Sequence, residues 1–257
     1  MHIFVLALSR LVPIALLLSL TLVGSRFAHD LVLRTRPHLA KWAFAGVSLV
    51  GLIAIVPNVL RAGLIVGAQW AANTNRYRAA DLLYSDYDAW NGRRSEDTLR
   101  EWAYVRMNNR DWAGAEEVLR LAETPTPQAR ILVGICQYYE GNPAAEATLR
   151  AVPDMSGTQL CVRDYLLGRI AEKRGDLARA FGLYASSASW EPNFFPSTYQ
   201  AARLALQKGN TRVATAIVDS YTRRFPMHRT AGDVVVLRDA IQRHTVPPEK
   251  EFVIVSD

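Results

Sequence analysis

Cysteine and histidine are the side chains in this chain most able to bind a metal ion or to act as nucleophile and base. Neither type occurs at a metal-ligand spacing such as Cys-x-x-Cys or His-x-x-x-His. The chain also lacks the Gly-rich, Gly-x-Ser-x-Gly and His-Glu-x-x-His patterns of nucleotide-binding proteins, serine hydrolases and zinc proteases. The residues concerned are Cys136, Cys161, His2, His29, His38, His228 and His244. We therefore expect no metal, no cofactor and no enzymatic activity.

Positive charge is concentrated near the N-terminus of the 257-residue chain. The net charge is +6, of which residues 1–24 carry +1 and residues 25–41 carry +3. Residues 42–257 share the remaining +2, which is too little for a groove that binds a phosphate backbone. We expect no nucleic-acid partner.

Two apolar segments predict insertion into a membrane. Trp42 to Leu60 carries no charge over 19 residues, which as a helix spans about 28 Å of a hydrocarbon core about 30 Å thick. The uncharged stretch resumes after Arg61, so this helix is expected to extend beyond the bilayer, with Pro57 as a candidate kink. The first segment, residues 1–29, is consistent with a second span or with a cleaved signal peptide. The lack of Lys and Arg before Arg10 favours the span.

The basic loop at residues 30–41 indicates the orientation of these spans. Short loops rich in Lys and Arg stay in the cytoplasm, which would place the C-terminal domain in the periplasm of a bacterial inner membrane. Arg10, Arg61, Arg76 and Arg78 lie on the other side in this topology and argue against it. The reverse orientation therefore stays open.

From about residue 75 to residue 226 the pattern is helical, and its turns recur at a fixed interval. Gly141-Asn142, Gly175-Asp176 and Gly209-Asn210 lie 34 residues apart, which is the tetratricopeptide period. The residues around these turns resemble that repeat. The positions expected to be structural in the repeats are Gly134, Gly141, Gly168, Gly175, Ala180, Gly209 and Ala214.

Weaker units precede these. Arg110-Asp111-Trp112 stands at a turn position, although the step to Gly141 is 31 residues. The helix after Pro143 matches the repeat poorly. Asn75-Arg76-Tyr77 resembles a further half unit, whose partner helix would be the extension of the second span.

The resemblance implies an all-α solenoid whose concave face is formed by the first helix of each unit and binds peptides or proteins. The family's groove positions carry many Tyr and Arg residues, which dominate interface hot spots. The candidate partner-binding residues are Arg100, Tyr104, Tyr138, Tyr165, Arg169, Tyr199 and Arg203, with Met107, Ile131, Ile135, Glu172 and Leu206 at the other groove positions. Packing against a neighbouring helix is the competing interpretation for each tyrosine. The family's Lys and Asn clamp for a C-terminal carboxylate is not matched.

The predicted organisation is an all-α fold with two N-terminal transmembrane helices, a solenoid and a C-terminal capping helix. A terminal helix is expected from Ala231 to Arg243, and the tail after it is expected to be a strand that adds to a partner's sheet, or a disordered or locally packed end. The repeat register places Cys136 and Cys161 about 13 Å apart, beyond disulfide reach, so both are expected to be buried free thiols. The expected segments are 1–29 (first span), 30–41 (basic loop), 42–74 (second span and extension), 75–226 (repeats) and 227–257 (cap and tail).

The favoured function is a membrane-anchored, non-catalytic scaffold that binds membrane or envelope proteins within an envelope-assembly or secretion complex. The alternative is an accessory to a polysaccharide polymerase, or a detached C-terminal part of one, because a span that runs into such repeats resembles the end of some O-antigen-ligase-type proteins. An enzyme that uses Tyr and Arg of the groove is the weakest interpretation, because no residue pair has acid–base or nucleophile spacing.

Overall fold

The computed structural model describes residues 37–90, 94–153, 157–226 and 231–254. Within these residues the chain is all-α, with an extended segment after the last helix. It divides into two compact units, Met1–Val105 and Arg106–Asp257. The first predicted span, residues 1–29, lies outside the described residues.

The first unit is built on one long helix. Helix α2 (Pro37–Asn73) continues through Pro57 and pairs with α3 (Tyr77–Ala89), and α4 (Glu96–Asn108) begins in this unit. The C-terminal half of α2 buries Ile65, Ala68 and Ala71, so the predicted pairing of the helix extension with the first repeat is present.

The middle of α2 leaves large apolar side chains without cover. Leu49, Val50 and Ile53 are 59%, 67% and 65% exposed. Among the described residues, one stretch, Leu49–Asn73, is long and apolar enough to cross a membrane.

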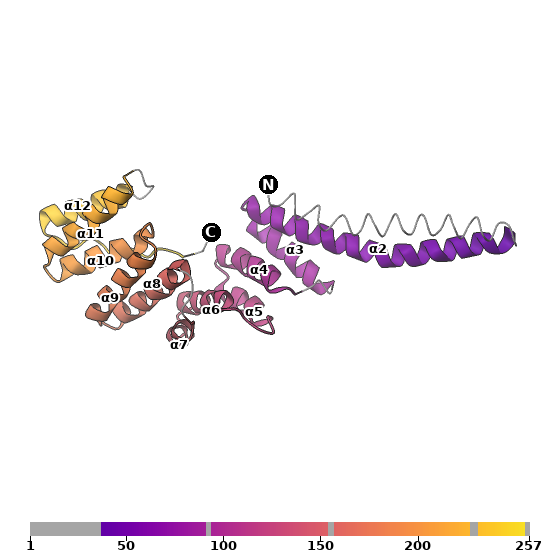
Figure 1. Cartoon of the computed structure of the whole chain (residues 1–257), viewed down its shortest axis with the longest axis horizontal. Coiled ribbons are helices and arrows are strands. Elements are labelled where there is room, and N and C mark those ends of the chain that lie inside the picture. The colour runs from indigo at the N-terminus through magenta and orange to yellow at the C-terminus, as the bar shows by residue number, and fades with distance from the viewer. Residues whose placement is uncertain (1–36, 91–93, 154–156, 227–230, 255–257) are drawn as a thin grey trace. The chain divides into compact units, whose positions relative to one another are not determined.

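The second unit is a series of antiparallel helix pairs (Figure 1). Neighbours along the chain pack together, α5 on α6, α6 on α7, α8 on α9, α9 on α10, α10 on α11 and α11 on α12. The helices are α5 (Trp112–Arg120), α6 (Pro127–Tyr139), α7 (Ala145–Arg150), α8 (Gly157–Lys173), α9 (Leu177–Trp190), α10 (Phe195–Gln207), α11 (Thr211–Arg224) and α12 (Ala231–Arg243). The predicted terminal helix is confirmed, and the poorly matching helix after Pro143 is the short α7.

The same turn ends the first helix of every pair. Its central residue has φ between 54° and 81°, a left-handed conformation that glycine adopts without steric cost. At Gly175 the next amide, of Asp176, donates to the carbonyl of Ala171 at 3.0 Å, and the Asp176 carboxylate then caps α9 by accepting from the amide of Arg179. The turn residues are Asn75, Arg110, Gly141, Gly175, Gly209 and His244. The predicted turns are confirmed, and His244 adds one that the sequence analysis did not include.

Small residues let paired helices approach closely. A Cβ on Gly168 of α8 would lie 2.6 Å from the Tyr184 ring of α9, and one on Gly134 of α6 would lie 2.5 Å from Leu149 of α7. Ala180 and Ala214 are fully buried in the second helices of their pairs. A larger side chain at any of these four positions would meet the neighbouring helix, which gives a physical reason for the structural role expected of them.

Candidate functional site

The C-terminal segment, residues 245–254, lies across the first helices of the second unit and is called the tail below. Each of α6, α8, α10 and α12 contributes a polar side chain to it. We call these residues the tail-binding face: Tyr139, Arg169, Tyr199, Gln200 and Asp233. The local-packing alternative for the tail is therefore confirmed, and the described tail contains no strand.

Most of these contacts are made to the tail's backbone. Tyr199 donates to the Pro248 carbonyl at 2.9 Å, Gln200 to that of Lys250 at 2.6 Å, and Tyr139 to that of Phe252 at 2.9 Å. The Tyr139 hydroxyl also accepts from the Ile254 amide at 2.7 Å. The helices thus bind the backbone of every second tail residue, from Pro248 to Ile254. A spacing of two residues is the period of an extended chain.

The Tyr139 hydroxyl suits this double role. Burial is the main cause that raises the pKa of Tyr139, so the group keeps its proton at neutral pH. A neutral hydroxyl can donate one hydrogen bond while it accepts another. Tyr139 therefore holds both ends of the Phe252–Ile254 segment.

Side chains of the tail add specific contacts. The Phe252 ring lies against Tyr199 and Phe195, with centroid distances of 5.5 and 6.2 Å. Lys250 pairs with Asp233 at 2.7 Å, and the Glu249 carboxylate accepts from Arg169 at 2.8 Å. Ile254 is 7% exposed. The tail is held by an acidic, an aromatic and an aliphatic side chain in addition to its backbone.

A buried charge cluster lies next to Glu249. Glu172 pairs with Arg203, lies 4.0 Å from Arg169, and accepts from the Tyr184 hydroxyl at 2.7 Å. The side chains of Arg169 and Arg203 are 3% and 7% exposed. Burial and the nearby charge of Arg169 lower the pKa of Arg203, whereas the Glu249 carboxylate opposes this shift. Two buried guanidinium groups face one largely buried carboxylate, that of Glu172, and the tail adds the more exposed carboxylate of Glu249.

The predicted site residues separate into three groups. Tyr138, Arg169, Tyr199 and Arg203 come together around the tail and the charge cluster, where Arg169 donates to the Tyr138 hydroxyl at 3.5 Å. Tyr165 is 1% exposed and packs against Tyr184 and Phe194, as the packing interpretation has it. A role of Tyr165 in partner binding stays a prediction.

The remaining groove positions are placed as follows. Arg100 and Tyr104 belong to the first unit, where Arg100 donates to Asp97 at 2.6 Å. Met107, Ile131, Ile135 and Leu206 are buried.

The sequence analysis missed Tyr139, Gln200 and Asp233. Tyr139 directly follows the predicted Tyr138, and Gln200 follows Tyr199. The available signal was a run of adjacent polar residues on the first helices, together with an apolar tail that begins with two prolines.

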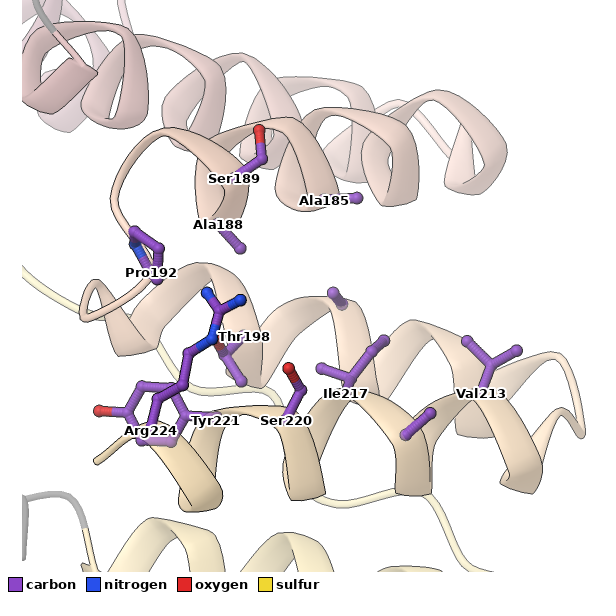
Figure 2. Close-up of a pocket in the computed structure, with 12 residues that line it drawn as sticks. Ala185, Ala188, Ser189, Pro192, Thr198, Val213, Ile217, Ser220, Tyr221 and Arg224 are labelled. Carbon is purple, nitrogen blue, oxygen red and sulfur yellow. The ribbon is translucent and has the colours of Figure 1, made fainter. Parts of the chain in front are cut away.

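A pocket, separate from the tail-binding face, lies among α9, α10 and α11 (Figure 2). Its volume is about 410 Å³, and its lining is formed largely by small and apolar side chains such as Ala185, Ala188 and Ile217. Among its described lining residues the one charged side chain is Arg224, which extends toward Thr198 in Figure 2. Nothing in this lining pairs a nucleophile with a base.

Neither cysteine joins a reactive group. Cys136 and Cys161 are free and buried, and no group of three metal-binding side chains occurs among the described residues. Burial is the main cause that raises the pKa of each thiol to about 12. The predicted buried free thiols are confirmed.

This burial predicts slow alkylation. At pH 8 both thiols are protonated and shielded, and the thiolate is the reactive form. Mass spectrometry is expected to show no added iodoacetamide on the folded chain after a few minutes, and two additions after denaturation in urea. Rapid modification of either thiol in the folded chain would contradict the buried placement.

The fold is similar to that of several solved structures, among them the following two. The crystal structure of MamA protein superposes with a TM-score of 0.51 at 16% sequence identity, covering 67% of this chain and 94% of that one. The crystal structure of the APC/C hetero-tetramer Cut9–Hcn1 gives a TM-score of 0.54 at 13% identity, covering 89% of this chain and 48% of that one. The chain thus spans about half the length of this second match. The sequence matches no family model, and no curated protein matches it.

At these identities the matches show the fold alone. Together with the recurrent turn and the close helix pairs, they establish a tetratricopeptide-like all-α repeat.

Proposed function

We propose that the chain is a non-catalytic scaffold of a bacterial inner membrane that binds partner proteins through the tail-binding face. The observation that carries this proposal is the seated tail, because it shows that the first helices hold an extended peptide. Three backbone carbonyls and one amide are bound there. Backbone recognition of an extended segment is a recurrent mode of peptide binding.

The exposed apolar side chains in the middle of α2, such as Leu49, Val50 and Ile53, support the membrane part of the proposal. Large apolar side chains that stay uncovered along a helix are unfavourable in water and are typical of membrane or partner contact. In the most apolar 18-residue window of Leu49–Asn73, only 6% of the residues are buried within the chain. We propose that the N-terminal helices anchor the scaffold, with the repeats in the periplasm, within an envelope-assembly or secretion complex.

The test uses crosslinking in the native membrane, followed by recovery of the full chain in mild detergent. A partner would use the same hydroxyls as the tail, so the tail contacts must first be weakened. The background is therefore the weak-tail variant, Glu249→Gln with Phe252→Ser. Into this background we introduce Tyr139→Phe with Tyr199→Phe, which removes two hydroxyls and keeps both rings.

Partner recovery is expected to fall about tenfold or more in the double Phe variant, because each lost hydrogen bond contributes about 1 kcal/mol. The matched control is Tyr77→Phe, whose hydroxyl donates to Asn75 in the first unit. Equal recovery from the double Phe variant and from the Tyr77→Phe control would exclude the tail-binding face as the partner site.

The membrane anchor is tested separately, by washing the membranes with alkaline carbonate before crosslinking. Release of the chain into the supernatant would contradict the anchor.

A further inference from the structure

The chemistry of the tail defines what else the tail-binding face accepts. We propose that this face selects an extended peptide with an acidic residue, an aromatic residue three positions later and an aliphatic residue two positions after that. The chain's own tail, with Glu249, Phe252 and Ile254 at these positions, is a tethered competitor that the partner peptide displaces. This inference rests on the proposed function and specifies its partner.

The acidic position follows from the charge balance. Without the tail, the buried cluster holds Arg169 and Arg203 against the single carboxylate of Glu172. The tail places the Glu249 carboxylate 2.8 Å from Arg169. A hydrogen bond between charged groups is stronger than a neutral one, so a neutral side chain at this position would leave a buried guanidinium without a close second carboxylate.

The aromatic and aliphatic positions follow from packing. The Phe252 ring meets Tyr199 edge to face, with an interplanar angle of 70°, and also contacts Phe195. Ile254 is buried at the far end, where its amide donates to Tyr139. By contrast, Glu251 is exposed and Lys250 meets solvent-accessible Asp233. Selectivity is therefore expected at three positions and tolerance between them.

The tether makes the tail an effective competitor. Helix α12 ends at Arg243, five residues before the first bound carbonyl, that of Pro248. A short flexible connection supplies an effective concentration on the order of 1 mM. Pro247 and Pro248 restrict the free chain further and lower the entropy lost when the tail docks.

The test measures binding of a fluorescein-labelled peptide of residues 246–257 by anisotropy. The proteins are the full-length wild-type chain and the weak-tail variant, both in detergent and both checked by circular dichroism. The wild-type peptide is expected to bind the weak-tail variant about tenfold more tightly, or better, than it binds the wild-type chain. Equal affinities for the two proteins would overturn the competition.

Selectivity is tested with altered peptides on the weak-tail variant. The Phe252→Ser peptide is expected to bind about tenfold more weakly and the Glu249→Gln peptide about fivefold more weakly. The Glu251→Gln peptide loses the same charge at an exposed position and is expected to stay within about twofold. Similar losses for Glu249→Gln and Glu251→Gln would overturn the acidic position, and no saturation up to about 1 mM would overturn the whole inference.

Two further outcomes separate the alternatives. A wild-type chain that sediments as a dimer, while the weak-tail variant is a monomer, would assign the tail to a second copy and overturn the tethered competitor. The crosslinking experiment tests the proposed function independently of the peptide measurements. If recovery depends on the Tyr139 and Tyr199 hydroxyls but the peptides show no selectivity, this inference fails and the scaffold stands.

Discussion

Glu172→Gln is expected to lower the free energy of unfolding by about 3–5 kcal/mol. Glu172 is the buried carboxylate shared by Arg203, Arg169 and the Tyr184 hydroxyl. Glutamine keeps the shape but removes the charge, so two guanidinium groups stay buried without their common partner. The shift is measured as the midpoint of urea unfolding followed by circular dichroism.

The control is the same chemical change at Glu249. That carboxylate also pairs with Arg169, but its side chain is 56% exposed, and water replaces a lost contact there. The expected loss is below about 1 kcal/mol. Equal losses at the two positions would mean that the buried cluster contributes no more than a surface ion pair.

Gly168→Ala is expected to cost about 3 kcal/mol, at the upper end of the range for overpacked cores. The new methyl group would lie 2.6 Å from Cε1 and 2.8 Å from Cδ1 of Tyr184. Tyr184 cannot easily move aside, because it is fully buried and its hydroxyl is held by Glu172. Thermal unfolding of the purified chain measures the loss.

Gly182→Ala, on the neighbouring helix α9, is the control, and it is expected to raise the stability instead of lowering it. Gly182 is exposed, and nothing lies within 4 Å of an added Cβ. Alanine in a helix interior is more favourable than glycine by about 1 kcal/mol, so this variant is expected to be slightly more stable. Destabilisation by both changes would indicate a general intolerance of the α8–α9 pair rather than a clash with Tyr184.

The repeat architecture was predictable because its signals are local. A left-handed turn needs Gly or a tolerant residue, and the helix after it needs a capping Asp or Asn at the next position. Both requirements fall within two adjacent residues, as at Gly175-Asp176 and Gly209-Asn210. The end of α12 at Arg243 also agrees with the apolar periodicity of its sequence.

The occupied site was not predictable because its contacts are distant in sequence. Glu249 lies 80 residues from Arg169, and Phe252 lies 113 residues from Tyr139. Periodicity identifies which helix face a residue occupies, but it does not show which segment covers that face. The resemblance named Tyr199 and Arg169 as groove residues, and it gave no indication that the tail contacts them.

The end of the repeat series links two properties that need not be related. His244 and Thr245 form the same turn that, in the other pairs, separates the first helix from the second. The amide of Thr245 donates to the Ala240 carbonyl at 3.0 Å. Pro247 and Pro248 then lack the amides that a helix needs and push the residues before them toward extended conformations. The segment released from the helical pattern is the one that reaches α8 and α6. The two prolines that follow α12 therefore disfavour a further helix and also favour the extended conformation that the tail-binding face holds.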